Sequence, residues 1–187
     1  METSTIIRYA ETEDELDQIL KLQNANHKDN IPLENRENNG FVTAKHNLDQ
    51  LKQMNASLKQ IIAVDNDVVV GYALVMLKEH SRLLPVLEPM FDLFNQLTYK
   101  GKALSSYQYY VMGQICIAET HRGQGLFEKL YLTHKKLFSD TFELCLTEVS
   151  SKNVRSMRAH QKVGLEKIHS YEDDSTYWNI MLWDWRK

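Results

Sequence analysis

The sequence has little cysteine, and its two cysteines are not spaced as metal ligands. Cys116 and Cys145 stand in separate apolar segments, and neither belongs to a C-x-x-C pair. We therefore expect no bound metal. We expect both thiols to be buried and reduced, because free cysteine behaves as a small hydrophobic side chain.

Long apolar runs and a strong excess of one charge are also absent. No stretch approaches the roughly 20 apolar residues of a membrane-spanning helix, and the acidic start METSTIIRYAETEDE does not resemble a signal peptide. The net charge of −3 argues against a nucleic-acid partner, which usually requires a basic face. With 43% hydrophobic and 25% charged residues, the 187-residue chain has a soluble globular composition. We expect one cytoplasmic domain over residues 1–187, without a membrane or nucleic-acid partner.

What is present is an alternation of strand and helix patterns along the chain. The expected strands cover 4–10, the two arms of a hairpin over 58–77, 107–118, 141–150, 165–174 and 175–185. The expected helices cover 11–26, 47–57, 125–139 and 153–164. The first has a capping box, Thr12 with Glu15, and the second has Asn47 as its N-cap.

Three segments carry turn and loop signals instead. The polar segment 27–39 is rich in asparagine and aspartate and is expected to be a loop. The segment 82–97 contains Pro85 and Pro89 and is expected to be a loop with one or two helical turns. The segment 98–107 is expected to be irregular.

The order of these elements predicts the fold class. Strand 107–118, helix 125–139 and strand 141–150 form a β-α-β unit, whose crossover makes the two strands parallel. The flanking strands follow each other closely and are expected to be antiparallel. The sequence therefore predicts an α/β fold with a mixed central sheet of about seven strands, flanked by helices.

Two glycines stand between a predicted strand and a predicted helix, in the segment RGQGLF. Helix N-termini carry unpaired N–H groups and the positive end of the helix dipole, so they attract anions. Arg122 would add a charge-assisted contact. An ordinary strand-to-helix turn is the alternative interpretation. The amides that would hold a phosphate are those of Gly123, Gln124, Gly125, Leu126 and Phe127.

Two other phosphate-binding motifs are excluded. The P-loop pattern G-x-x-x-x-G-K-[ST] does not occur in the chain. A dinucleotide fingerprint requires a third glycine where Glu128 stands, and it usually follows the first strand of a fold rather than the fourth.

The segment RGQGLF resembles the R-G-x-G-x-G/A loop of the GNAT-type N-acetyltransferases. Arg122 and Gly125 match its fixed positions, and Phe127 replaces a glycine or alanine. A later segment, NVRSMRAHQKVGL, is similar to the family pattern N-x-x-[AS]-x-x-x-Y-x-K-x-G-F. Its matching residues are Asn153, Ser156, Lys162 and Gly164, whereas His160 replaces the tyrosine and Leu165 the phenylalanine. The resemblance covers residues 61–185, and before them only the order of elements fits.

The resemblance implies a single-domain GNAT-like fold, with the sheet splayed at its middle, and acetyl-CoA as co-substrate. It implies transfer of the acetyl group, by direct attack, to a primary amine of a small molecule or peptide. Ile115, Cys116 and Ile117 would run beside the pantetheine arm, with the amide of Ile115 or Ile117 polarising the thioester carbonyl. The loop from Arg122 to Phe127 would hold the pyrophosphate. Asn153 would help to position the cofactor, and it also fits a helix N-cap.

The reaction also needs a base for the amine and a donor for the leaving thiolate. His160 stands where the family often has a tyrosine whose hydroxyl acts on the leaving group. It is therefore a candidate proton donor, or else a packing residue. Glu148, near the end of its strand, is the candidate base or else a rim carboxylate. Glu79 is an alternative base. Other possible donors are Tyr107, Tyr109 and Tyr110.

The acceptor side is expected to be built by segment 34–44 and by the long insert 80–110, because loops on a rigid scaffold commonly carry specificity. Four aromatic side chains either line this pocket or form a satellite core: Phe41, Phe91, Phe94 and Tyr99. Trp183 and Trp185 are expected on one face of the last strand, where an exposed pair would mark a homodimer face and a buried pair would not. The functional alternatives are a non-catalytic acyl-CoA sensor and a phosphate-binding regulator.

Overall fold

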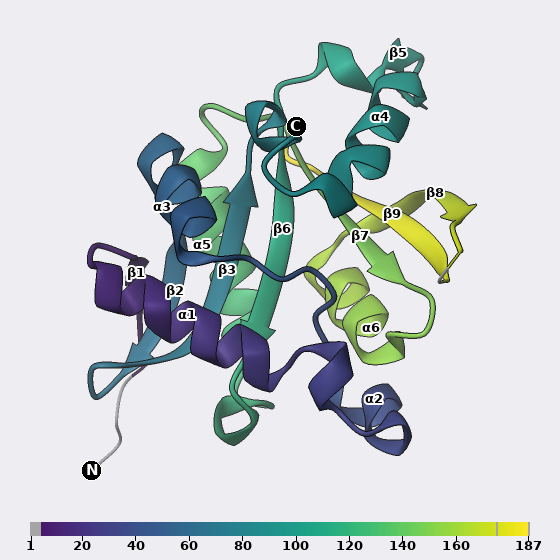
Figure 1. Cartoon of the computed structure of the whole chain (residues 1–187). Helices are drawn as coiled ribbons and strands as arrows, with labels where there is room; N and C mark the ends of the chain where they lie inside the picture. The colour runs from purple at the N-terminus through teal and green to yellow at the C-terminus, as the bar shows by residue number, and fades with distance from the viewer. Residues whose placement is uncertain (1–4, 175, 187) are drawn as a thin grey trace.

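The computed structural model describes residues 5–174 and 176–186, and its centre is a mixed sheet of seven strands in the order β1-β2-β3-β6-β7-β9-β8 (Figure 1). The predicted strands over 4–10 and 175–185 each begin at a residue outside the described part. The sheet strands are β1 (Ile6–Tyr9), β2 (Ile61–Asp65), β3 (Val68–Met76), β6 (Tyr109–Ile117), β7 (Leu144–Ser150), β8 (Glu166–Glu172) and β9 (Tyr177–Asp184). The helices are α1 (Glu13–Ala25), α2 (Leu33–Asn39), α3 (Leu48–Ser57), α4 (Glu88–Gln96), α5 (Leu126–Phe138) and α6 (Val154–Val163).

The strand pairing confirms the predicted topology. β6 and β7 are parallel and are joined by α5, whereas every other pair in this sheet is antiparallel. Across the described residues, no helix combines the length and the apolar character needed to cross a bilayer.

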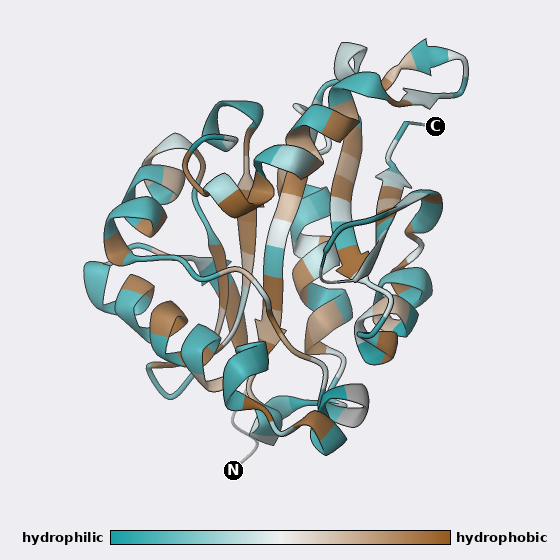
Figure 2. Ribbon diagram, turned by 45° about the vertical axis from the view of Figure 1, so that its right-hand side comes forward, coloured by the Kyte–Doolittle hydropathy of each residue, from teal (hydrophilic) through white to brown (hydrophobic). Residues whose placement is uncertain are grey.

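The central strands are largely hydrophobic, brown in Figure 2, and their side chains are buried on both faces of the sheet. In β3, Tyr72 and Leu74 join one cluster while Ala73 and Val75 join the other, because successive side chains alternate between faces. The first cluster lies under α1, α3 and α4. The second lies under α5 and α6. A functional site in this fold must therefore open at an edge of the sheet or between strands.

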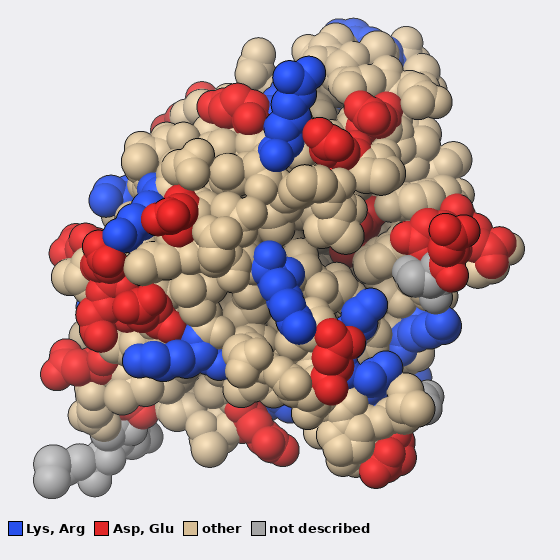
Figure 3. Space-filling view, in the orientation of Figure 1, with Lys and Arg blue, Asp and Glu red and all other residues tan. Residues whose placement is uncertain are grey.

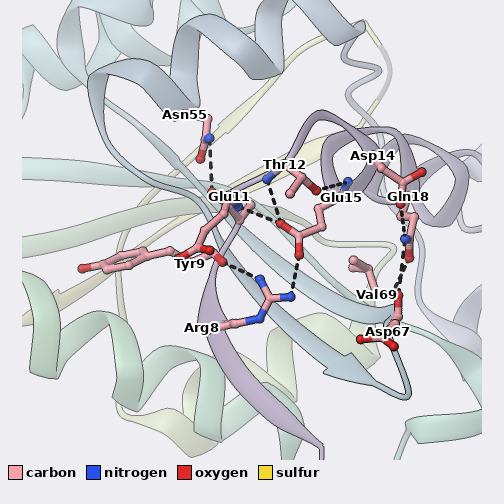
Figure 4. Close-up of polar contacts among 11 residues, drawn as sticks. Arg8, Tyr9, Glu11, Thr12, Asp14, Glu15, Gln18, Asn55, Asp67 and Val69 are labelled. Atoms are coloured by element: carbon pink, nitrogen blue, oxygen red, sulfur yellow. Dashed lines mark hydrogen bonds and ion pairs between the residues drawn. The ribbon is translucent and has the colours of Figure 1, made fainter.

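The start of α1 is fixed to the sheet by polar contacts (Figure 4). The carboxylate of Glu15 accepts hydrogen bonds from the backbone N–H groups of Glu11 (2.7 Å) and Thr12 (3.0 Å), which confirms the capping box, and from Arg8 (2.5 Å). Gln18, one turn further on, accepts from the backbone N–H of Val69 on β3 at 2.7 Å. The far end of α1 is thereby held at a defined place over β6.

The predicted loop over 27–39 is wrong, because the structure has a 3₁₀ turn at Lys28–Asn30 and the helix α2. Pro32 suits the start of a helix, and Gly40, with φ of 67°, ends it in a conformation that favours glycine. Arg36 also donates to the carbonyl of Ile31 at 3.0 Å. The asparagine-rich composition indicated a loop, but α2 packs against α6, and a single sequence does not reveal that contact.

The insert is more ordered than predicted. It contains α4, which is longer than one or two turns, and a small hairpin of β4 (Thr98–Tyr99) and β5 (Lys102–Ala103) within the segment expected to be irregular. The turn between these strands uses positive φ at Lys100 (47°) and Gly101 (77°). Tyr99 donates to Glu166 at 2.7 Å, so the hairpin is tied to β8.

The insert aromatics belong to the core rather than to a pocket. Phe91 is 4% exposed, Phe94 is fully buried, and Tyr99 is 9% exposed, and all three join the cluster under α1, α3 and α4. These three aromatic residues are therefore core residues and do not line a pocket, and they belong to a main core cluster rather than to a satellite core. Trp183 and Trp185 share one face, as predicted, with ring centroids 5.7 Å apart. Because Trp185 is buried, the pair does not form the exposed surface on which the homodimer expectation rested.

Three buried histidines predict a steep loss of stability in mild acid. Burial lowers the pKa of His134 to about 3 and that of His46 and His160 to about 4. Below the ordinary histidine pKa of about 6.5, the unfolded chain therefore binds protons that the folded chain does not. Each histidine should lower the free energy of unfolding by about 1.4 kcal/mol per pH unit between pH 6 and 4. The variant His134→Phe should reduce the pH dependence of the free energy of unfolding by the contribution of one histidine. Urea unfolding between pH 6 and 4 measures it. An unchanged slope would contradict the prediction.

Candidate functional site

The sheet opens between its two parallel strands. β6 pairs with β7 only from Tyr109 to Val111, opposite Leu144 to Leu146. The hydroxyl of Thr147 donates to the carbonyl of Met112 at 2.9 Å and forms a last link between the strands. Beyond this link, β6 continues to Ile117 and β7 continues to Ser150, but the two strands no longer pair with each other. Figure 1 shows them diverging.

The free edge of β6 presents backbone groups to this opening. Ala118 donates to the carbonyl of Val70 on β3 at 2.8 Å. In an antiparallel pair the bonded residues alternate, so Ile115 and Ile117 direct their N–H and C=O groups away from β3. The carbonyl of Ile117 indeed accepts from Arg122 at 3.1 Å. The N–H groups of Ile115 and Ile117 are therefore donors along the wall of the opening.

The loop after β6 ends in a helix start without a side-chain cap. Gly125, with φ of 75°, is the N-cap of α5, and Gly123 has φ of 78°. A Cβ at either glycine would have no atom within 4 Å, so these positions require glycine for its backbone conformation and not for space. Side chains cap α1, α3 and α6, but none caps α5. Within the described part of the chain, the backbone N–H groups of residues 123–128 donate to no recorded acceptor.

These two features border one pocket of about 280 Å³. The segment after α2 forms one wall, and β6, the loop and α6 form the others. All the predicted cofactor-binding residues except Gln124 line it; the Gln124 side chain donates to the carbonyl of Thr120 at 3.2 Å instead. The predicted residues along the pocket are Ile115, Cys116, Ile117, Arg122, Gly123, Gly125, Leu126, Phe127 and Asn153.

Several lining residues were not singled out from the sequence as binding residues. Asn26 and Val42 come from the N-terminal part, where the sequence motifs do not extend. Arg155, Ala159 and Lys162 lie on α6 at helical spacing from one another, so the period of that helix, followed back from the motif residue Lys162, could have identified the other two. Basic side chains gather over α6 in Figure 3.

Two hydrogen bonds connect the walls of the pocket. Arg122 donates to the side-chain carbonyl of Asn26 at 2.5 Å, and Asn153 donates to the backbone carbonyl of Phe41 at 2.8 Å. Asn153 also accepts from the backbone N–H of Ser156 at 3.3 Å, so the expected N-cap of α6 is confirmed. The N-terminal segment is thereby bound to both motif regions.

His160 does not lie where a proton donor is needed. It is 2% exposed and is not among the residues that line the pocket. Its Nδ1 lies 2.7 Å from the carbonyl oxygen of Ser156, which can only accept, so Nδ1 carries the hydrogen and Nε2 does not. Burial lowers the pKa of His160 to about 4, which keeps the ring neutral near pH 7. The geometry supports the alternative of a packing residue and gives no support to a proton donor.

The Glu148 carboxylate is partly buried, and its pKa is raised toward neutrality. Its side chain follows Leu144 and Leu146 on the α1 and α4 face of the sheet, just beyond the last link between β6 and β7. Burial raises its pKa to about 7, and a hydrogen bond of 2.5 Å from the hydroxyl of Tyr171 opposes this rise. A substantial fraction of Glu148 is therefore deprotonated near neutral pH. Glu148 does not line the cofactor pocket itself.

The remaining catalytic alternatives lie at the opposite end of the sheet. Glu79 is exposed in the turn that follows β3. Tyr107 and Tyr109 precede or begin β6, and Tyr110 is buried against His134 under α5. None of these residues lines the pocket.

Solved structures share this fold over nearly the whole chain. A chain of the NatC complex bound to a Gag peptide and CoA matches with a TM-score of 0.68 and 12% identity, over 98% of this chain and 99% of that one. NAA60 of Arabidopsis thaliana, in complex with acetyl-CoA, gives 0.64 and 13%, over 97% and 99%. A Desulfovibrio desulfuricans protein assigned to the GNAT acetyltransferases gives 0.64 and 11%, over 97% and 99%. No family model matches the sequence, and no curated protein does.

These likenesses show that the chain has the GNAT fold, which the two sequence motifs implied. The mixed sheet of seven strands, its parallel central pair and the opening between them are the features that the prediction required.

The contact between Tyr171 and Glu148 predicts a measurable pKa change. Because the phenol donates to the charged carboxylate, Tyr171→Phe should raise the pKa of Glu148 further above 7. The titration can be followed by NMR of side-chain-labelled glutamate. Tyr177→Phe, at a 54% exposed tyrosine of β9, is the matched control. An unchanged Glu148 pKa would show that the hydrogen bond is absent in solution.

Proposed function

We propose that residues 1–187 form an acetyl-CoA-dependent N-acetyltransferase domain, which transfers the acetyl group to a primary amine of a small molecule or peptide. The observation that carries the proposal is that a free strand edge and an uncapped helix start border the same pocket. Acetyl-CoA is a ligand that needs both, because it has a peptide-like arm and a pyrophosphate.

The proposed placement of the cofactor follows from these two features. The pyrophosphate would accept from the amides of residues 123–128, where the dipole of α5 favours negative charge. Arg122 and the basic residues of α6 would add favourable charge. The pantetheine arm would lie along Ile115 and Ile117 and bring the thioester carbonyl to one of their N–H groups. The NatC chain and NAA60 were solved with CoA and acetyl-CoA, which supports acetyl-CoA as the co-substrate.

In the proposed reaction the amine attacks the thioester directly. A C–N bond forms, the C–S bond breaks, and the sulfur leaves with the electron pair as a thiolate. Glu148 takes the proton that the amine loses. A covalent acetyl-cysteine route is disfavoured, because burial raises the pKa of Cys116 to about 12 and leaves little reactive thiolate.

The alternative function is a non-catalytic acyl-CoA sensor. One observation favours it: His160, at the position of the family's acidic tyrosine, is buried and does not line the pocket. A screen of amines with thiol release as the readout separates the two functions. Turnover of any amine excludes the sensor, and binding of acetyl-CoA without turnover of any amine favours it.

The first test is calorimetric titration with acetyl-CoA, with CoA and ATP as comparisons. We expect micromolar affinity for acetyl-CoA and CoA, and no binding of ATP. Gly125→Val should abolish binding, because a β-branched residue disfavours the φ of 75° that orients the loop amides. The strain should cost about 1–2 kcal/mol of stability, so the variant should remain folded. Retained affinity in this variant would contradict the placement of the pyrophosphate.

A second test addresses Glu148 as the base. Glu148→Gln should lower kcat/KM by roughly 10²–10⁴-fold, the usual contribution of a general base. In the unchanged enzyme, kcat/KM should rise through pH of about 7 as Glu148 loses its proton. The variant should lack that rise when the same amine is used, since the ionisation of the amine contributes equally to both profiles. A rise of equal size in the variant would assign the base elsewhere.

A further inference from the structure

The pocket contains a single hydroxyl group among its recorded lining residues, and it belongs to Ser156. Ser156 lies one turn into α6, after the Asn153 cap, and is partly exposed to the pocket. Most of the other side chains that could donate are engaged elsewhere or are cationic, and the remaining neutral amide donor is Asn39, at the end of α2. The Cys116 thiol is a weak donor, and Arg122 is bonded to Asn26 and Ile117.

The hydroxyl of Ser156 has an unusual second neighbour. The Nδ1 of His160 lies 2.7 Å from the backbone carbonyl oxygen of Ser156 and 3.2 Å from its Oγ. Because the carbonyl can only accept, Nδ1 is the donor, and the serine oxygen accepts a second share of the same hydrogen. The hydroxyl hydrogen of Ser156 is then available to a partner in the pocket.

The ring of His160 is held in this orientation by aromatic packing. Phe127 and Tyr131 meet it edge-on, with centroid distances of 5.1 Å and 5.5 Å. The Nε2 atom of His160 is buried and has no hydrogen-bond partner among the described residues. The polar contacts of the ring are therefore those of Nδ1 with Ser156. Without the contact from Nδ1, a helical serine would tend to bond a carbonyl of its own preceding turn. His160 therefore favours a serine hydroxyl that points into the pocket.

We propose that Ser156 donates a hydrogen bond to the sulfur of the leaving CoA thiolate, and that His160 is the residue that positions it. This rests on the proposed function. The amides of the pantetheine arm can pair with the edge of β6, whereas the sulfur has no backbone partner of that kind. The sulfur gains negative charge as the C–S bond breaks, so a donor aimed at it acts most strongly in the transition state. No proton leaves Ser156, and the thiolate is protonated by solvent after release.

The decisive measurement is the pKa of the CoA thiol when CoA is bound, followed by the ultraviolet absorption of the thiolate. In the unchanged protein this pKa should lie below that of free CoA. Ser156→Ala should raise it by about one unit or more, and Ser156→Thr, which keeps the hydroxyl, should restore the lower value. With an active amine, Ser156→Ala should lower kcat by about 10- to 100-fold while the Kd for acetyl-CoA changes less than about threefold.

His160→Phe tests the positioning role. The variant keeps the aromatic packing and removes a buried nitrogen without a partner, so we expect it to fold. It should raise the thiol pKa less than Ser156→Ala does, and the effects of the double variant should not be additive. Additive effects would overturn the link between the two residues.

The outcomes separate this inference from the proposed function. An unchanged thiol pKa in Ser156→Ala overturns the contact with sulfur, as does a loss of acetyl-CoA affinity without a pKa shift, which would place Ser156 on another part of the cofactor. If no amine is turned over but the pKa shift is present, the enzyme assignment fails and the contact stands. If CoA does not bind, both fail.

Discussion

The separation of β6 from β7 is the constraint on which the rest of the site depends. A strand that leaves its neighbour exposes N–H and C=O groups, and buried groups of this kind must find partners. The protein meets part of this need itself: Thr147 bonds the carbonyl of Met112, and Arg122 bonds the carbonyl of Ile117. The pairing of β3 with β6 is interrupted by a bulge at Gly113, and the separation of β6 from β7 begins at this point. A Cβ at Gly113 would come within 2.8 Å of the Met76 side chain. What is left for a ligand is a set of donors, from Ile115 to the start of α5.

Two of the three departures from the family pattern are in contact with each other. Phe127 stands in place of a small residue and His160 in place of tyrosine, and their rings meet at 5.1 Å. A side chain on a helix leans over the turn that precedes it, so the ring of His160 lies over the turn of Ser156. A large residue at 127 fills the space beside that turn, and the ring at 160 is held inside the core. The replacement of tyrosine by His160 removes one potential donor from the pocket. The hydroxyl group that remains among the lining residues is that of Ser156.

The sequence predicted the parts of the fold that follow from local patterns. The capping box of α1, the Asn47 N-cap of α3 and the loop before α5 each depend on a few adjacent residues, and the parallel pair β6 and β7 follows from the β-α-β order of elements. The sequence did not predict α2, because its partner α6 is distant in the chain. It underestimated the length of α4, which packs against residues 85–87 and 104–106 of its own insert, because the two prolines indicated a loop. It placed His160 at the correct point of α6 but not its direction, which depends on the packing of Phe127 and Tyr131. It also left the partner of Glu148 unidentified, because Tyr171 reaches that carboxylate from a different strand.

A buried amide network explains how the N-terminal wall of the pocket is held against β6. The side chain of Gln114 accepts from Gln23 and Tyr72 and donates to the carbonyl of Ala44. The amide of Gln23 also donates to Nδ1 of His46 and accepts from the backbone N–H of that residue, so the amide oxygen and nitrogen of both glutamines are hydrogen-bonded. Removing one member would leave a buried amide without a partner, which is costly in a low-dielectric interior. Gln114 directly precedes Ile115, so the network fixes the segment after α2 to the strand whose free edge faces the pocket. The two walls are therefore joined by buried hydrogen bonds that a displacement of either wall would break.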